Sequence, residues 1–495
     1  MVNALLVAGT TSDAGKSLVT AALCRWLARE GVKVAPFKAQ NMSLNSGVTA
    51  DGCEIGRAQV MQAAAAGIEP EAIMNPVLLK PGGDRSSQVV LLGHPVAEVT
   101  ALSYRDLKPR LMTTVLDSLA QLRSRFDVVI CEGAGSPTEI NLRSDDIANM
   151  GLARAAGLPV VVVADIDRGG VFASLYGTLA LLEEADQALI AGFIINKFRG
   201  DPALLAPGLQ TLRGLTGRPT VGVLPWVRDL GLDVEDSLGL PAVNEVRGDP
   251  SASLTVAVIR LPLISNFTDV DALCVEPGVS VRFVDRPEAL SDADLVVIPG
   301  TRATVEDLQW LRRRGLDTAL ARRSAGGGPI LGVCGGYQML AAEIVDEVES
   351  RAGTVSGLAL LPTRVRFAKT KTLGRPAGTA YGLPVLGYEI HHGITEVYGG
   401  DRFLDGCRVG SVWGTTWHGV LENDQFRRAF LQEVAALTGS SYRPQGEVRF
   451  ADVRQRRFDV LADLVVEHLD TDALHRLLDV GVAPDLPMVR PELRR

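Results

Sequence analysis

Short apolar runs alternate along this chain with longer stretches in which apolar residues recur at helical spacing. In the first half the apolar runs occupy residues 3–8, 32–36, 127–131, 159–164, 189–195 and 220–223. Runs that are apolar at nearly every position predict parallel strands covered by helices on both faces, because a half-exposed strand would alternate with polar residues. We therefore expect residues 1–235 to form one doubly wound α/β domain.

Strand signals resume after a stretch without a sustained pattern. Residues 236–253 read DSLGLPAVNEVRGDPSAS, a composition typical of a linker between domains. Further apolar runs at 254–259, 294–298, 329–333 and 410–414 predict a second doubly wound α/β domain over residues 254–440. We expect residues 441–495 to be a C-terminal helical extension, because apolar residues at 458, 461, 464, 465 and 469 have helical spacing.

Composition narrows the expected chemistry. The 495 residues include 50 Lys and Arg against 58 Asp and Glu, a net charge of −8 without a basic block, so nothing indicates binding to nucleic acid or to an acidic membrane. The six cysteines are widely spaced and indicate neither a disulfide framework nor a zinc site. No apolar stretch reaches the ~18 residues of a membrane helix. We expect a soluble, cytoplasmic protein that acts on small molecules, with its oligomeric state left open.

A glycine-rich loop lies between the first expected strand and a helical pattern at residues 18–30. It reads GTTSDAGKS, and its candidate nucleotide-binding residues are Gly9, Thr10, Asp13, Gly15, Lys16 and Ser17. Glycines let backbone N–H groups curve round phosphate oxygens at a helix N-terminus, while Lys contacts the β- and γ-phosphates and Ser ligates Mg²⁺. Five residues separate Gly9 from Gly15 where the common motif has four, so the loop is a variant phosphate loop.

Carboxylates that could serve a metal ion beside this loop come from two places. The apolar run at 127–131 is followed by Glu132, at the carboxyl edge of the expected sheet, where it could hold Mg²⁺ directly or through water. Asp51 and Glu54 are a further source, with a solvated loop as the alternative. The predicted metal ligands are therefore Ser17, Asp51, Glu54 and Glu132.

A second centre is expected where the run GPILGV leads into a sharp turn at Cys334, which a helical pattern follows. This order of strand, cysteine between small residues and helix is typical of a nucleophile elbow, in which the helix N-terminus favours a thiolate. His418, 84 residues downstream, is the expected base, and His391 and His392 are further candidates for positioning. An inert core cysteine and structural histidines are the alternatives.

These motifs together resemble the family of cobyric acid synthases and cobyrinic acid a,c-diamide synthases, and the order of the phrases favours the cobyric acid synthases. The matching phrases of the first half are KAQNMSLNS, EIGRAQ, MNPVLLKP, EGAGSP, INLR, DIANM, ADIDRGGV and INKFRGD. Those of the second half are IPGTRAT, the Cys334 elbow, GYEIH and residues 413–419. The resemblance implies a dethiobiotin synthetase-like ATP-binding domain followed by a class I-like glutamine amidotransferase domain.

The resemblance also implies roles in the amidotransferase half. Cys334 would attack the carboxamide of glutamine, and His418 would move the proton. The backbone N–H of Gly335, with one near Gly300, would form the oxyanion hole. One departure leaves the set incomplete: Val420 stands where many amidotransferases have Glu two residues after the histidine. The third member is therefore undetermined, with Glu422 as one candidate.

The implied reaction is amidation of the b, d, e and g carboxylates of adenosylcobyrinic acid a,c-diamide, with ATP, Mg²⁺ and glutamine, through an acyl phosphate and ammonia. Asp146 would assist activation of the acid substrate. Asn196 would contact the adenine side of ATP, with a turn or helix-cap role as the alternative. Two other functions stay open: amidation of the a and c carboxylates by the sister enzyme, and a nonenzymatic P-loop regulator with an inactive amidotransferase-like domain.

Overall fold

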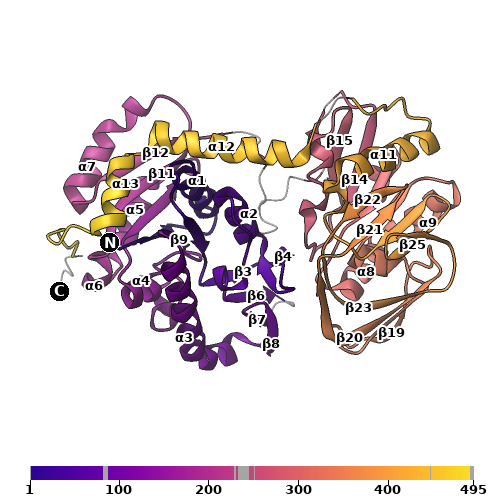
Figure 1. The fold of residues 1–495 in the computed structure, drawn as a ribbon, viewed down its shortest axis with the longest axis horizontal. Coiled ribbons are helices and arrows are strands. Elements are labelled where there is room, and N and C mark those ends of the chain that lie inside the picture. The colour runs from indigo at the N-terminus through magenta and orange to yellow at the C-terminus, as the bar shows by residue number, and fades with distance from the viewer. Residues whose placement is uncertain are drawn as a thin grey trace. The chain divides into compact units, whose positions relative to one another are not determined.

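The computed structural model describes residues 2–81, 87–227, 230–231, 243, 245–249, 251–445 and 448–490. The chain folds into two compact units (Figure 1). The first unit contains Met1–Ser43, Ile55–Leu232 and Gln455–Arg495, and the second unit contains Leu44–Glu54 and Asp233–Arg454. The short segment Leu44–Glu54 therefore belongs to the second unit, although the sequence around it folds with the first.

The first unit is built on a six-stranded parallel sheet. Its order is β12 (Thr220–Pro225), β11 (Ile190–Phe198), β10 (Val160–Asp165), β1 (Ala4–Gly9), β9 (Val128–Glu132) and β2 (Val34–Phe37). Each of the six apolar runs of the first half forms one of these strands. Val160 and Val162 of β10 join one apolar cluster, and Val161 and Val163 join another on the opposite face. Both faces are buried, which explains why the strands carry no polar alternation.

Helices cover both faces of this sheet. The cluster on one face includes residues of α3 (Ala101–Arg125), α4 (Met150–Ala156), α5 (Val171–Ala180) and α7 (Ala206–Thr216), and the other includes α1 (Lys16–Arg29) and α2 (Arg57–Ala66). The remaining elements are α6 (Glu184–Gln187), the 3-10 turns η1 (Ala72–Met74), η2 (Ile140–Asp145) and η3 (Pro202–Leu205), and a small sheet in the order β3 (Gln40–Met42), β6 (Val77–Pro81), β7 (Ser87–Leu91), β8 (His94–Val99).

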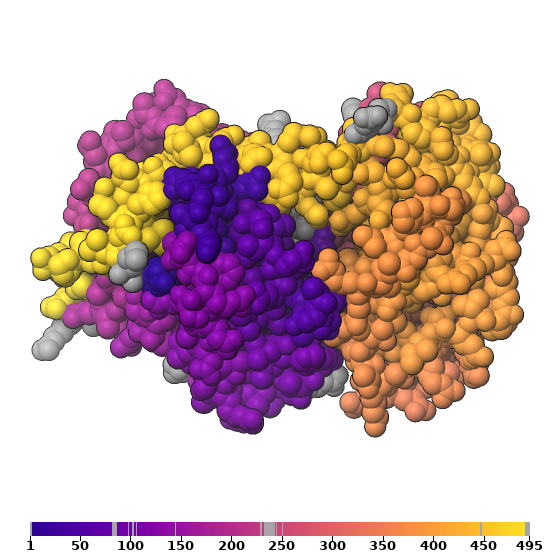
Figure 2. Space-filling model, in the orientation of Figure 1, coloured from indigo at the N-terminus to yellow at the C-terminus, as the bar shows by residue number. Residues whose placement is uncertain are grey.

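The C-terminal helices pack onto the first unit. They are α12 (Phe450–His468) and α13 (Thr471–Val480). Phe458, Leu461 and Val465 of α12 enter the apolar cluster beside α1. The N–H of Asp470 donates to the carbonyl of Val221 in β12 at 2.8 Å. Figure 2 shows this yellow segment lying against the indigo N-terminal part of the chain.

The second unit is built on an eight-stranded sheet with a parallel centre. Its order is β13 (Val246–Gly248), β15 (Val279–Val284), β14 (Leu254–Ile259), β16 (Leu295–Ile298), β17 (Ile330–Val333), β26 (Val412–Thr415), β25 (Gly406–Val409) and β24 (Asp401–Phe403). The strands from β15 to β26 run parallel, and β13, β25 and β24 each pair antiparallel with the neighbouring strand toward the centre of the sheet. The four runs expected as strands are β14, β16, β17 and β26. Of the expected linker, residues 236–242 lie outside the described residues, and β13 forms within its remainder.

The second unit also contains helices, 3-10 turns and smaller strands outside the eight-stranded sheet. Its helices are α8 (Thr304–Arg313), α9 (Leu316–Ala325), α10 (Gly335–Leu340) and α11 (Asp424–Thr438), and its 3-10 turns are η5 (Phe267–Val270), η6 (Leu273–Val275), η7 (Pro287–Leu290) and η8 (Val420–Glu422). Its smaller strands are β4 (Ser46–Val48), β18 (Glu343–Asp346), β19 (Gly353–Ser356), β20 (Thr363–Gly374), β21 (Ala377–Ala380), β22 (Leu383–Leu386) and β23 (Glu389–Val397). Strand β5 (Glu54–Gly56) pairs with β4 and crosses the boundary between the units after Glu54. Among the described residues, no helix combines the length and apolar character needed to cross a bilayer.

Candidate active sites

The phosphate loop joins β1 to α1 in a conformation that requires glycine at two positions. Gly15 has a φ of 98°, and a Cβ atom there would lie 2.2 Å from Nδ2 of Asn196. A Cβ atom on Gly9 would lie 2.9 Å from Cγ of Lys16. The Asn196 amide donates to the carbonyl of Ala14 at 2.9 Å. Asn196 therefore contacts the loop backbone directly, and any side chain on Gly15 would push the two apart.

Backbone carbonyls of the loop hold the lysine in place. The Lys16 side chain is buried, and its ammonium donates to the carbonyls of Thr11 and Ser12 at 2.9 and 3.0 Å. The N–H of Thr10 donates to the carbonyl of Val163 at 2.9 Å, which ties the loop to β10. The positive charge thus lies over the curved loop at the N-terminus of α1, where backbone dipoles also favour an anion.

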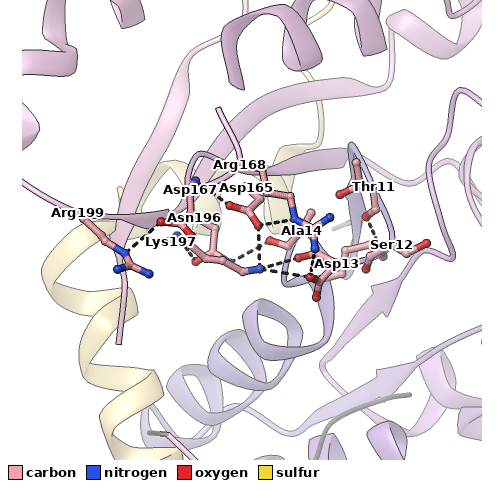
Figure 3. Close-up of polar contacts among 11 residues, drawn as sticks. Thr11, Ser12, Asp13, Ala14, Asp165, Asp167, Arg168, Asn196, Lys197 and Arg199 are labelled. Atoms are coloured by element: carbon pink, nitrogen blue, oxygen red, sulfur yellow. Dashed lines mark hydrogen bonds and ion pairs between the residues drawn. The ribbon is translucent and has the colours of Figure 1, made fainter. Parts of the chain in front are cut away.

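Ion pairs from the ends of β10 and β11 brace the outer side of the loop (Figure 3). Arg168 pairs with Asp13 at 2.5 Å, and Lys197 pairs with Asp165 at 2.8 Å. The Lys197 ammonium also donates to the carbonyl of Asp13 at 2.9 Å. Asp13 therefore acts as an anchor for the loop, through both its side chain and its backbone.

A buried carboxylate lies at the start of α1. Glu132 is fully buried at the end of β9, and its Oε1 accepts from Ser17 Oγ and from Lys38 Nζ, each at 2.8 Å. Its Oε2 accepts from Gln62 Nε2 at 2.5 Å. Ser17 and Glu132 are therefore brought together, as predicted from the two motifs.

Lys38 is a site residue that the sequence analysis did not single out. Strand β2 lies beside β9 with Phe37 opposite Cys131, so the next residue of each strand, Lys38 and Glu132, come together at the sheet edge. The available signal was the position of Lys38 directly after an apolar run. Which carboxylate Lys38 contacts depends on the order of the strands in the sheet, and the apolar run alone does not give that order.

The other two expected metal ligands have different partners. Asp51 and Glu54 both belong to the second unit. The Asp51 carboxylate accepts from the hydroxyl of Thr49 two residues earlier. Glu54 is buried and pairs with Lys371 at 2.6 Å. The structure thus does not group Asp51 and Glu54 with Ser17 and Glu132.

The Asp146 carboxylate accepts hydrogen bonds from three backbone N–H groups. Its Oδ1 accepts from the N–H groups of Ala148 and Asn149 at 2.9 and 2.8 Å, and its Oδ2 accepts from the N–H of Gly151 at 2.9 Å. These bonds satisfy N–H groups at the start of α4, which is the chemistry of a helix cap. The carboxylate of Asp146 therefore shapes the loop around it.

Two pockets of the first unit adjoin these residues. One has a volume of about 230 Å³ beside α1, and its walls include Leu18, Val19, Trp226, Leu461, Leu464 and the polar Asn196. The Arg199 guanidinium covers the Trp226 ring at 4.2 Å from its centroid. The second pocket, which we call the polar pocket, has a volume of about 100 Å³ and lies beside the chain that follows β9. Polar side chains such as Lys108, Ser136 and Asn149 line it together with apolar ones such as Leu142 and Ile147. An apolar pocket beside a phosphate loop suits a nucleobase, whereas the polar pocket suits a carboxylate.

Cys334 occupies a strained turn between β17 and α10. Its φ of 50° is in the left-handed region, which non-glycine residues rarely adopt. The N–H of Cys334 donates to the carbonyl of Thr415 in β26 at 2.8 Å. A Cβ atom on Gly336 would lie 1.9 Å from the carbonyl oxygen of Ile298, so the elbow packs backbone against backbone. This geometry matches the predicted nucleophile elbow.

His418 contacts both Cys334 and Asp269. Its Nδ1 lies 2.7 Å from Oδ2 of Asp269, and the N–H of Gly419 donates to Oδ1 of the same carboxylate at 2.7 Å. Burial disfavours the imidazolium, but the charge of Asp269, the Cys334 thiol and hydrogen bonds to both raise the pKa of His418 to about 10. The three side chains form an acid–base–nucleophile set.

Asp269 supplies the third member that the sequence left undetermined. It lies on η5, 149 residues before His418, and no spacing rule connects the two. The candidate Glu422 pairs instead with Arg454 at 3.4 Å. A search for a motif around the histidine does not find Asp269, because this carboxylate lies in a distant part of the chain and not two residues after His418.

Two expected oxyanion residues also lie at this site. A Cβ atom on Gly300 would lie 2.8 Å from Cε1 of His418, and one on Gly335 would lie 2.7 Å from Cγ2 of Thr301. The loop after β16 and the first turn of α10 therefore touch beside the catalytic set. The backbone of Gly300 thus lies beside His418, and that of Gly335 beside Thr301.

The other two candidate histidines, His391 and His392, both have lowered pKa values. Burial lowers the pKa of His391, and the nearby His418 lowers it further, although its Nδ1 contacts the carbonyl of Gly393 at 2.8 Å. Burial, with the charge of Lys371, lowers the pKa of His392 to about 4. The pKa of each of these imidazoles is therefore shifted in the opposite direction from that of His418.

Comparison with known proteins identifies two domain families in this chain. Residues 5–238 match the CobQ/CobB/MinD/ParA nucleotide binding domain, and residues 255–426 match the CobB/CobQ-like glutamine amidotransferase domain. Cobyric acid synthases from Streptomyces avermitilis and Streptomyces coelicolor are each 64% identical to this chain, over 99% of both sequences. Cobyric acid synthase from Rhodococcus jostii is 57% identical, over 99% of this chain and 98% of its own. This chain belongs to the cobyric acid synthase family.

Proposed function

We propose that this protein amidates the b, d, e and g carboxylates of adenosylcobyrinic acid a,c-diamide to give cobyric acid, at the expense of ATP and glutamine. The observation that carries the proposal is the presence in one chain of two built centres: a phosphate loop with Ser17 on Glu132, and Cys334 with His418 and Asp269. A carboxylate is a poor electrophile, so amide formation needs both an activating and a nitrogen-supplying site.

The second unit releases ammonia from glutamine. The Cys334 thiolate adds to the carboxamide carbon, and the backbone N–H of Gly335 stabilises the oxyanion. The His418 imidazolium gives its proton to the departing nitrogen, so ammonia and a glutamyl thioester form. Neutral His418 then takes a proton from water, which hydrolyses the thioester to glutamate and restores the thiolate. Asp269 orients His418 and stabilises its charged form throughout.

The first unit makes the carboxylate electrophilic. Lys16 and the loop backbone hold the β- and γ-phosphates of ATP while a substrate carboxylate attacks the γ-phosphorus, giving an acyl phosphate and ADP. Ammonia then adds to the acyl carbon, and phosphate leaves as the amide forms. The base of ATP occupies the pocket beside Trp226, where the Asn196 amide offers hydrogen bonds and the apolar walls exclude water.

The donors at this centre fit Mg²⁺, which is a further part of the proposal. Ser17 Oγ and Glu132 Oε1 are hard oxygen ligands 2.8 Å apart, close to the spacing of neighbouring ligands around one such ion. Bound there with ATP, the ion would neutralise charge on the transferred phosphoryl group. Lys38, on the same carboxylate oxygen, would then be released toward the acyl phosphate.

The polar pocket after β9 is the proposed site of the reacting carboxylate. Its volume of about 100 Å³ fits one side arm of a corrinoid and excludes the macrocycle. Asp146 assists by capping α4 and so fixing this wall, because its oxygens accept from three backbone N–H groups. A catalysing thiol suits a reducing compartment, and we place the reaction in the cytoplasm.

A direct assay distinguishes this function from the sister reaction. The purified protein is incubated with ATP, Mg²⁺ and glutamine, and with either adenosylcobyrinic acid or its a,c-diamide, and the products are identified by mass spectrometry. We expect the a,c-diamide to gain amides at the b, d, e and g positions. Amidation of the a and c carboxylates alone would support the sister activity, and the absence of glutamine-dependent ATP turnover with either corrinoid would contradict both.

A further inference from the structure

The segment Leu44–Glu54 is joined to the Asp269 turn by a reciprocal pair of buried hydrogen bonds. The N–H of Asn266 donates to Oδ1 of Asn45 at 2.7 Å, and the N–H of Ser46 donates to Oδ1 of Asn266 at 2.9 Å. All three residues are at most 4% exposed. Each of the two asparagines thus accepts a hydrogen bond from a buried backbone N–H of the other segment.

Asn266 holds the turn that carries Asp269. It is in the left-handed region with a φ of 51° and stands immediately before η5. The N–H of Asp269 donates back to the carbonyl of Asn266 at 3.1 Å, which closes the turn. Its carboxylate then contacts both His418 Nδ1 and the N–H of Gly419. The direction of the Asp269 side chain therefore depends on the backbone conformation of Asn266.

The far end of the same segment is fixed independently. The Glu54 carboxylate and the Lys371 ammonium of β20 form an ion pair with exposed fractions of 0 and 6%. With Asn45 at one end and Glu54 at the other, the segment is built into the second unit. Its sequence nevertheless lies within the region that matches the nucleotide-binding domain, residues 5–238.

We propose that Asn45 is a positioning residue of the glutaminase: it holds Asn266 in its left-handed conformation and thereby keeps Asp269 against His418. A segment encoded within the nucleotide-binding sequence thus completes the glutaminase site. The inference rests on the proposed function for its role in synthesis, but glutamine hydrolysis can be measured without any corrinoid. The positioning role of Asn45 and the proposed function can therefore be refuted separately.

The pH dependence of glutamine hydrolysis reports the position of Asp269. The titratable groups that face His418 are Asp269 from η5, Cys334 from the elbow, His391 from β23 and the ring of Tyr388, which stacks on His418 at 5.2 Å. Of these, Asp269 supplies the negative charge that is independent of the thiol. If Asp269 moves away, the pKa of His418 falls, and the thiolate–imidazolium pair is lost at lower pH.

The test compares Asn45→Ala with Asn45→Asp, which keeps an acceptor oxygen for the N–H of Asn266. For Asn45→Ala we expect kcat for glutamine hydrolysis to fall at least about tenfold, with KM changed less than about twofold and the alkaline limb of the pH profile moved to lower pH. Asn45→Asp should recover most of the rate and the profile. Met42→Ala, at a 56% exposed position just before the segment, is the matched control and should behave as the parent does.

Ammonia-dependent amidation separates positioning from folding. Asn45→Ala should keep this activity, which needs only the first unit's chemistry, and a wild-type rate and pH profile for glutamine hydrolysis would overturn the proposal. If Asn45→Ala does not fold, the glutaminase activities of Asn266→Gly and Asn266→Ala test the proposal instead. Glycine adopts the left-handed region without strain and should keep more glutaminase activity than alanine, and equal activities would contradict the proposal. Failure of wild-type protein to amidate any corrinoid would instead refute the proposed function alone.

Discussion

Nδ1 of His418 lies 2.7 Å from Oδ2 of Asp269, and the two side chains are buried together beside Cys334. A carboxylate at this distance fixes the tautomer of the neutral imidazole and stabilises the charged form. It occupies the functional position that Val420 cannot fill. The set therefore has three members, although only Cys334 and His418 could be predicted from sequence motifs.

Replacing Asp269 with Asn should slow glutamine hydrolysis about a hundredfold and change its pH dependence. The pKa of His418, about 10 in the structure, is raised in part by the charge of Asp269. Without that charge His418 loses its proton at lower pH, so the alkaline limb of kcat/KM should move down the pH scale. The measurement is glutamate release between pH 6 and 10, and an unchanged limb would contradict the assignment. Glu422→Gln should leave the profile as it is.

Replacing Cys334 with Ala should abolish the use of glutamine but leave amidation with ammonium. The thiol is needed only to release ammonia, and the first unit receives ammonia whatever its source. The check is corrinoid amidation by the folded variant with glutamine and, separately, with a high concentration of ammonium. Cys274→Ala, at a partly buried cysteine that bonds the carbonyl of Val270, is the control and should still use glutamine. A folded Cys334→Ala variant that ammonium does not rescue would mean that the two centres are not separate.

Replacing Lys16 with Ala should lower ATP-dependent amidation at least about a hundredfold and leave some glutaminase activity. The Lys16 ammonium lies over the loop that would hold the phosphates, and the transferred charge would lose its principal cation. Amide formation and glutamate release are measured on the same sample. Undiminished amide production would remove the phosphate-loop assignment.

Replacing Lys38 with Met should destabilise the first unit by about 3 kcal/mol, because Glu132 would remain as a buried charge without its cation. The double variant Lys38→Met with Glu132→Gln removes both charges and should recover most of that stability. Amidation should stay low in both variants, because both lack the cation and the double variant also lacks the proposed Mg²⁺ ligand Glu132. Chemical denaturation gives the stabilities, and an activity that recovers along with stability would show that Lys38 is only a structural residue.

The sequence by itself determined the elements whose residues are contiguous. The strand, glycine loop and helix from β1 to α1, and the strand, Cys334 turn and helix from β17 to α10, were predicted at their positions because backbone conformation and burial pattern there are local properties. The expectations of two α/β domains and of membership in the cobyric acid synthase family are confirmed.

Only the tertiary structure decided which distant residues meet. Lys38 contacts Glu132, 94 residues away, because β2 lies beside β9 in the sheet. The order of strands in a sheet cannot be predicted from any one apolar run. Asp269 reaches His418 across 149 residues, and Glu54 joins Lys371 across 317, although Glu54 had been expected beside the phosphate loop. Such contacts arise when separate segments exclude water from a common core, so the partners of a buried charge depend on the packing of the whole chain.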